Sequence, residues 1–166
     1  MNLATNALKW PLMGNNSLER WVSPSSRLVV LGDAAHAMVP YMSQGAAMAV
    51  EDGAALAVAV SNMASLSELG FALGIFETAR RQRTTMMQEA SMVNAMLWHF
   101  PDGPEQRARD DAMRPETQGR HFLSSPNQWS DPRTQSWAYG YDAEEDMEER
   151  WQDAIRHLSA QVPVVE

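Results

Sequence analysis

One stretch near the start of the chain carries residue types whose spacing suits ligand binding. A brief branched apolar run, residues 27–31, ends at Gly32 and Asp33. A run so short and continuous predicts a strand buried on both faces. Asp33 then stands at the C-terminal end of that strand, where open α/β sheets bind ligands. A carboxylate there can accept hydrogen bonds from the hydroxyls of a ribose or ribityl chain.

A loop containing Pro40 leads from this turn to an alanine-rich segment. The segment opens with Gly45, Ala46 and Ala47, and small residues continue to about Met63, which predicts a helix. The first amides of a helix have no partner within it, and the helix start carries a positive partial charge. Small residues let a flat ligand approach that backbone closely. The spacing therefore favours an anionic or electron-rich ligand laid across the helix start.

Further helices are expected on either side of this segment. Trp21 is expected to dock a short piece that precedes the strand. A capping-box spacing of Ser65 and Glu68 predicts the start of a long helix that ends at the Pro- and Gly-rich residues 100–104. The expected apolar stripe of that helix is formed by Ile75, Ala79, Met86, Ala90, Val93 and Leu97.

Charged residues near these helices have simpler interpretations. Glu51 and Asp52 are expected to face away from the core near a helix start, where carboxylates favour the helix dipole. Arg80, Arg81 and Arg83 are expected largely on the polar side of the long helix.

Histidines give no metal-ligand pattern. His36 is expected to play a structural role in the turn beside Asp33. His99, His121 and His157 share no metal spacing with one another or with carboxylates, so no metal site is predicted.

The C-terminal third has little periodicity. Residues 101–141 are expected to form an ordered tail on the surface. Its expected aromatic anchors are Trp129, Trp137, Tyr139 and Tyr141. Asp142 with Glu145 is a plausible cap for a final amphipathic helix. The apolar positions of that helix are Met147, Trp151, Ile155 (or Ala154) and Leu158.

Composition bounds the class of protein. The 166 residues suit one ordinary domain, and an apolar share of 45% can form a core. A net charge of −8 argues against general binding to nucleic acid or to anionic membranes. The absence of cysteine excludes disulfides and thiolate chemistry. No apolar window reaches the length of a membrane span, so a cytoplasmic protein is expected.

The segment from the apolar run through the alanine-rich helix resembles the second flavin motif of group A flavoprotein monooxygenases. The residues that carry this likeness read Arg27-Leu-Val-Val-Leu-Gly-Asp-Ala-Ala-His36, then Pro40, then Gln44-Gly-Ala-Ala-Met-Ala-Val-Glu-Asp-Gly-Ala-Ala-Leu-Ala57. The pattern is most similar to the salicylate-hydroxylase-like aromatic-ring hydroxylases of catabolic and secondary-metabolite pathways. The resemblance extends to residues 76–83 and into the tail, so it covers most of the chain.

This resemblance implies a set of FAD-binding residues and no catalytic side chain. The set comprises Gly32, Asp33, Pro40, Gly45, Ala46 and Ala47. Asp33 is expected to bind the ribityl hydroxyls, and Pro40 to lie beside the isoalloxazine near the point of oxygen reaction. The three amides that open the alanine-rich helix are expected to contact the pyrimidine end of the ring.

The resemblance also implies a fold and a reaction. The expected fold is mostly α with a short buried strand, the C-terminal portion of an α/β FAD-binding fold that lacks the N-terminal Rossmann βαβ unit. Residues 1–100 would be the C-terminal part of the FAD-binding domain and residues 101–166 a tail with the final helix. FAD and NAD(P)H would serve the oxygen-dependent hydroxylation of an aromatic or enolic small molecule.

The diphosphate-binding fingerprint of such enzymes, Gly-x-Gly-x-x-Gly, occurs nowhere in the sequence. A separate N-terminal FAD-binding segment is therefore an expected partner. The chain is expected to be truncated, and whether it is active alone stays open. Two alternatives remain open. One is a non-catalytic helical remnant that binds a partner protein, and the other is a cofactor-free binding module with a tightly packed alanine-rich helix.

Overall fold

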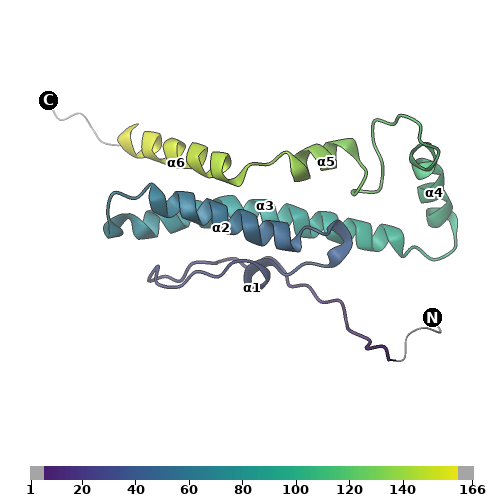
Figure 1. Ribbon diagram of the computed structural model, residues 1–166, viewed down its shortest axis with the longest axis horizontal. Helices are drawn as coiled ribbons and strands as arrows, with labels where there is room; N and C mark the ends of the chain where they lie inside the picture. The colour runs from purple at the N-terminus through teal and green to yellow at the C-terminus, as the bar shows by residue number, and fades with distance from the viewer. Residues whose placement is uncertain (1–5, 161–166) are drawn as a thin grey trace.

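A computed structural model describes residues 6–160 of the chain, and these residues are mostly helical, as predicted (Figure 1). The helices are α1 (Asp33–His36), α2 (Gly45–Ser61), α3 (Leu69–Trp98), α4 (Pro104–Thr117), α5 (Pro132–Tyr139) and α6 (Ala143–Ala160), with the 3-10 helices η1 (Pro40–Met42) and η2 (Leu66–Glu68).

The centre of the molecule is the pair formed by α2 and α3. These two helices run side by side, with α5 and α6 along one side and α1 with its flanking segments along the other (Figure 1). Small residues on α2 permit this packing, since Ala55 and Ala59 are fully buried. The core cluster comprises Trp21, Ala35, Ala55, Ala59, Ala72, Phe76, Met147 and Trp151. The predicted docking of Trp21 is confirmed by its place in this core.

The strand expected over residues 27–31 does not form in the described chain. The segment pairs only through an isolated antiparallel bridge between Val22 and Val29. Leu28 is 64% exposed, so the run is not buried on both faces. A strand needs a ladder of backbone partners, and residues 6–160 offer this segment only the one bridge.

The loop expected after Asp33 is partly helical. It contains the short helix α1 and the 3-10 helix η1, whose first residue is Pro40. Proline is favoured at the first position of a helix, because an N–H there would have no acceptor within the helix.

The buried face of α3 differs from the predicted apolar stripe. Met86 and Val93 were expected to be buried but are 44% and 41% exposed. The face that packs inward instead comprises Ala72, Leu73, Phe76, Ala79, Arg80, Arg83, Thr84, Met87, Ser91 and Asn94. The predicted apolar stripe was wrong because several buried positions of α3 are polar, and a pattern of apolar residues alone does not detect them.

The tail between residues 101 and 141 contains two helices that were not predicted. Hydrophobic periodicity does not reveal α4, because none of its residues is buried and its sequence has no apolar stripe. Of the expected aromatic anchors, Trp129 and Tyr139 are exposed. Trp137 instead packs against a second core cluster, which comprises Met42, Met48, Met87 and Ala138.

Two predicted helix caps have different outcomes. Ser65 makes no capping hydrogen bond, and the Glu68 carboxylate instead accepts from the amide of Ala64 at 2.8 Å. Asp142 caps α6 as predicted, because its Oδ1 accepts from the amides of Glu144 and Glu145 at 2.9 and 3.0 Å. The final helix is amphipathic, with Met147 and Trp151 buried.

Across residues 6–160, every helix is too short or too polar to cross a bilayer.

The packing predicts a large effect of one core substitution. Phe76→Ala should lower the free energy of unfolding by about 3–5 kcal/mol, because Phe76 is fully buried and its removal leaves a cavity. Urea unfolding followed by circular dichroism measures the loss. Leu66→Ala is the control, since Leu66 is 82% exposed and should change the stability little. Equal losses in the two variants would contradict this description of the core.

Candidate functional site

The turn at Gly32 lies against α2. Gly32 precedes α1 with φ of 59°, a conformation that side-chain-bearing residues rarely adopt. A Cβ added there would contact the Cβ of Ala49 at 3.5 Å, so the turn approaches α2 closely. Asp33, the first residue of α1, is exposed.

Asp33 lies beside the start of α2. A Cβ built on Gly45 would be 4.0 Å from Oδ1 of Asp33 and 3.8 Å from the side chain of Met38. The two positions are twelve residues apart in sequence, and the short helix α1 with the loop after it brings them together.

The first turn of α2 has no side-chain cap from the described part of the chain. Gln44 precedes the helix and makes no side-chain capping bond. The first backbone bond into the helix is made by Met48, whose amide donates to the carbonyl of Gln44 at 2.9 Å. Among the described residues, the amides of Gly45, Ala46 and Ala47 therefore have no protein acceptor. A carboxylate acceptor beside three amide donors suits a ligand with hydroxyls at one point and electron-rich oxygens at another.

Pro40 lies on the loop between these two features and is exposed. The loop is held by polar side chains of α3. Ser91 Oγ donates to the carbonyl of Val39 at 2.9 Å, and Asn94 Nδ2 donates to the carbonyl of Tyr41 at 3.2 Å. Pro40 is thereby supported on both sides by the C-terminal half of α3.

A buried carboxylate connects α1, α2 and α3. Asp52 Oδ2 accepts from the amide of Gly32 at 2.9 Å and lies 2.7 Å from Nε2 of His36. Asp52 Oδ1 accepts from Nε of Arg80 at 2.8 Å. The side chains of Asp52, His36 and Arg80 are at most 1% exposed. The structural role expected of His36 in this turn fits this position, where its ring contacts the buried carboxylate of Asp52.

The predictions that Asp52 faces away and that Arg80 and Arg83 lie on a polar helix side were wrong. Asp52 and Arg80 are fully buried, and Arg83 is 4% exposed. A buried guanidinium needs a buried acid, and Asp52 and Glu51 on the facing helix provide it.

A spacing in the sequence could have revealed this face. Met48, Asp52, Ala55 and Ala59 follow one another in steps of four, three and four residues. Phe76, Arg80, Arg83 and Met87 do the same on α3. Such steps place all members of a set on one side of a helix, whatever their polarity.

Ionisation of the pair is strongly favoured. Burial alone raises the pKa of Asp52, but hydrogen bonds from His36, the Gly32 amide and Arg80 together bring it below the ordinary value of 3.8. Burial lowers the pKa of Arg80, yet its bond to Asp52 and the charge of Glu51 raise it above its ordinary value. The two groups are therefore a charged pair at neutral pH.

Arg83 joins the tail to the same network. Its guanidinium pairs with Glu51 at 3.0 Å and donates to the carbonyl of Ala138 at 2.8 Å. It also lies over the rings of Trp137 and Tyr141, at 4.5 and 4.2 Å from their centroids. The C-terminal end of α5 is thus fixed against the helix that opens at Gly45.

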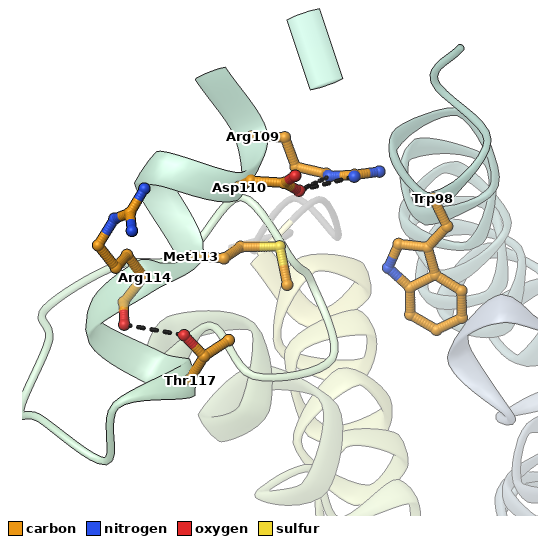
Figure 2. A pocket seen from close by; sticks show the side chains of 6 residues that line it. All are labelled: Trp98, Arg109, Asp110, Met113, Arg114 and Thr117. Carbon is orange, nitrogen blue, oxygen red and sulfur yellow. Dashed lines mark hydrogen bonds and ion pairs between the residues drawn. The ribbon is translucent and has the colours of Figure 1, made fainter. Parts of the chain in front are cut away.

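A separate cleft of about 410 Å³ lies between the end of α3 and α4 (Figure 2). Trp98 faces Met113 across it, and Arg109 lies at one edge (Figure 2). Arg109 pairs with Asp110 at 2.7 Å and donates to the carbonyl of Leu97 at 2.8 Å, so it stabilises the end of α3. None of the predicted ligand-binding residues lines this cleft.

No group of three or more histidine, aspartate or glutamate side chains in residues 6–160 is placed to hold a metal ion.

Comparisons with known proteins point to one family. The family described as an FAD binding domain matches residues 9–90. The chain is 37% identical over 135 residues to the FAD-dependent monooxygenase OpS4 of Beauveria bassiana, covering 81% of this chain and 31% of that protein. It is 44% identical over 90 residues to the 6-hydroxynicotinate 3-monooxygenase of Pseudomonas fluorescens, covering 54% of this chain and 22% of that enzyme.

The fold also matches a solved structure. The crystal structure of FqzB superposes with a TM-score of 0.66 at 26% identity, covering 93% of this chain and 32% of that chain. The chain thus spans about a third of the length of FqzB and of OpS4.

The buried carboxylate predicts a loss of stability in acid. Since the folded-state pKa of Asp52 lies below 3.8, its ionised form stabilises the fold above that value, and this contribution is lost as the pH falls through the lower folded pKa. The free energy of unfolding, measured in urea at several pH values, should fall as the pH is lowered through 3.8 toward the folded-state pKa.

Asp52→Asn should flatten part of that fall, because asparagine carries no charge to protonate. The groups that face this carboxylate, His36, Arg80 and Glu51, are unchanged in the variant. Asp102→Asn, at an exposed position, is the control and should follow the parent chain. Parallel curves for parent and Asp52→Asn would contradict the assigned role of the charge.

Proposed function

Because this chain belongs, through residues 9–90, to the FAD binding domain family of the FAD-dependent monooxygenases, we propose that it forms one half of a flavin site. The observation that carries the proposal is the exposed Asp33 carboxylate beside three amides of α2 that no group within residues 6–160 caps. The first amides of a helix are satisfied by a side-chain cap, by water or by a ligand, and at this partly exposed helix start they are free to bind a ligand.

The residues present fit FAD on the chemistry of their donors and acceptors. Asp33 offers an acceptor for ribityl hydroxyls, and the amides of residues 45–47 offer donors for the carbonyl oxygens of the pyrimidine ring. Gly45 leaves open the space that a Cβ would fill beside the Asp33 carboxylate. The two groups lie close enough to contact neighbouring parts of one ligand.

Each residue of the proposed site has a distinct role. Asp33 and the turn at Gly32 bind the ribityl chain, and Pro40 borders the isoalloxazine. The amides of residues 45–47 and the dipole of α2 stabilise negative charge at the pyrimidine end of the ring. When bound, FAD supplies the redox chemistry, in which NAD(P)H is the reductant and oxygen hydroxylates an aromatic or enolic small molecule.

A second segment completes the site in this proposal. It carries the strand–Gly-x-Gly-x-x-Gly–helix unit that binds the diphosphate, which this sequence lacks. Residues 27–31 would then pair with its sheet and become a full strand of an α/β fold. Residues 1–100 belong to the FAD-binding domain and residues 101–166 to the tail. We expect this enzyme to be cytoplasmic and to act in secondary metabolism.

One observation favours an alternative, a non-catalytic helical protein that binds a partner. Several large apolar side chains of the N-terminal segment are exposed: Leu8 94%, Trp10 82%, Leu12 60% and Met13 74%. Such a surface suits association with another protein.

Absorbance in the flavin bands separates the two functions. The purified chain, mixed with the N-terminal segment of a similar monooxygenase, should retain FAD only under the flavin proposal.

The role of Asp33 can be tested in that reconstituted complex. Asp33→Ala should weaken FAD binding by about tenfold, the effect of losing a charged hydrogen-bond acceptor. The unfolding transition should change little, because Asp33 is exposed. Asp102→Ala, also exposed, is the matched control and should bind FAD as the parent does. Equal FAD contents in both variants would contradict the assignment.

A second test uses two glycines of α2. Gly45→Ala places a methyl group beside Asp33 and should weaken FAD binding, although its nearest neighbours at 3.8 and 4.0 Å allow it in the chain alone. Gly53→Ala is the control, since nothing lies within 4 Å of a Cβ there. Both variants should unfold at the same or slightly higher urea concentration, because alanine favours helix over glycine by about 1 kcal/mol. If Gly45→Ala binds FAD like Gly53→Ala, the ligand does not approach this backbone.

A further inference from the structure

Both ends of α1 are attached to a single oxygen atom on α2. Asp52 Oδ2 lies 2.9 Å from the amide of Gly32, just before the helix, and 2.7 Å from Nε2 of His36, its last residue. Asp33 lies between these two attachments. A four-residue helix held at both ends cannot turn without breaking one of the bonds, so Asp52 fixes the backbone from which the Asp33 side chain projects.

The other oxygen of the carboxylate is held from α3. Arg80 Nε donates to Asp52 Oδ1 at 2.8 Å, and Arg80 Nη2 donates to the carbonyl of Met48 at 3.3 Å. Met48 makes the first backbone bond of α2, to Gln44. Arg80 therefore fixes the carboxylate relative to the helix turn whose amides are open.

We propose that Asp52 is a positioning residue, which holds the Asp33 carboxylate in register with the amides of residues 45–47. This inference rests on the proposed flavin site. Asp52 touches no ligand in it and acts through Gly32, His36 and Arg80. Its burial strengthens the effect, since water cannot replace a lost partner of a carboxylate that is 0% exposed.

The C-terminal tail extends the same support. Arg80 Nη1 donates to the hydroxyl of Tyr141 at 3.2 Å, and that hydroxyl donates to Asp146 Oδ2 at 2.9 Å. Asp146 lies on α6, which packs along α2 (Figure 1). The orientation of Arg80, and through it that of Asp52, is thus fixed by a helix that lies far along the chain.

Asparagine cannot replace Asp52 in this arrangement. An asparagine that accepts from Gly32 and His36 through its oxygen turns its NH₂ group toward Arg80, where donor meets donor. The opposite orientation removes the acceptor from the Gly32 amide. In either case one attachment of α1 or of Arg80 is lost.

Glu51 provides a matched control. It neighbours Asp52 on α2 and pairs with Arg80 at 2.8 Å and with Arg83 at 3.0 Å, but it makes no bond to α1. Glu51→Gln therefore removes one charge from the same network without releasing the Asp33 turn. If the network acted only through the stability of the fold, variants that lose equal stability would also show equal Gly32 exchange and equal FAD affinity.

The first measurement is amide hydrogen exchange in the full chain alone, which requires no FAD. The amide of Gly32 should exchange slowly in the parent and in Glu51→Gln. It should exchange at least about tenfold faster in Asp52→Asn, after correction for the change in global stability. Rapid exchange of Gly32 in the parent chain would by itself overturn the proposal, even if Asp52→Asn failed to fold.

The second measurement is FAD affinity in the complex with an N-terminal dinucleotide-binding segment. Asp52→Asn should weaken binding by about tenfold to a hundredfold, and Glu51→Gln by less than about threefold. Equal affinities of the two variants overturn the positioning role while leaving the flavin site intact. Absence of FAD from the parent complex overturns the flavin site itself, and the exchange data for Gly32 then still report whether Asp52 fixes the turn.

Discussion

A carboxylate removed from water has to be surrounded by donors, and this requirement organises the centre of the molecule. Asp52 is held by a backbone amide, an imidazole and a guanidinium, and each comes from a different part of the chain. An isolated buried charge would lower the stability of the fold by several kcal/mol, so the burial of Asp52 requires these three partners. Both α1 and α3 are bonded to α2 through this one side chain.

Small residues make that arrangement possible. The alanines of α2 let α3 approach closely enough for Arg80 to reach across, and Ala49 leaves room for the turn at Gly32. The small residues Gly45, Ala46 and Ala47 likewise leave the first turn of α2 open on its outer side. Tight internal packing and an accessible backbone at the helix start therefore both depend on the small residues of α2.

The sequence predicted the parts of this structure that depend on local chemistry. The alanine-rich helix, the Asp142 cap and the docking of Trp21 follow from spacing, and the resemblance to flavin monooxygenases that rests on residues 27–57 is confirmed by the family match. Predictions failed where non-local pairing decides. Asp52 and Arg80 look like surface charges until each is known to face the other, and residues 27–31 form a strand only where a sheet is available to pair with them.

The charged side chains near the first turns of α2 balance one another. Two carboxylates, Glu51 and Asp52, lie against two guanidiniums, Arg80 and Arg83. An uncompensated Asp52 within two turns of the helix start would oppose the positive potential that the free amides create. The arginines cancel that opposition, so the carboxylate can hold the turn at Gly32 without weakening the positive potential at the helix start. Placing the compensating charges on α3 has a second effect: the potential at the start of α2 depends on the docking of α3, and the site acquires its full electrostatic character only in the packed fold.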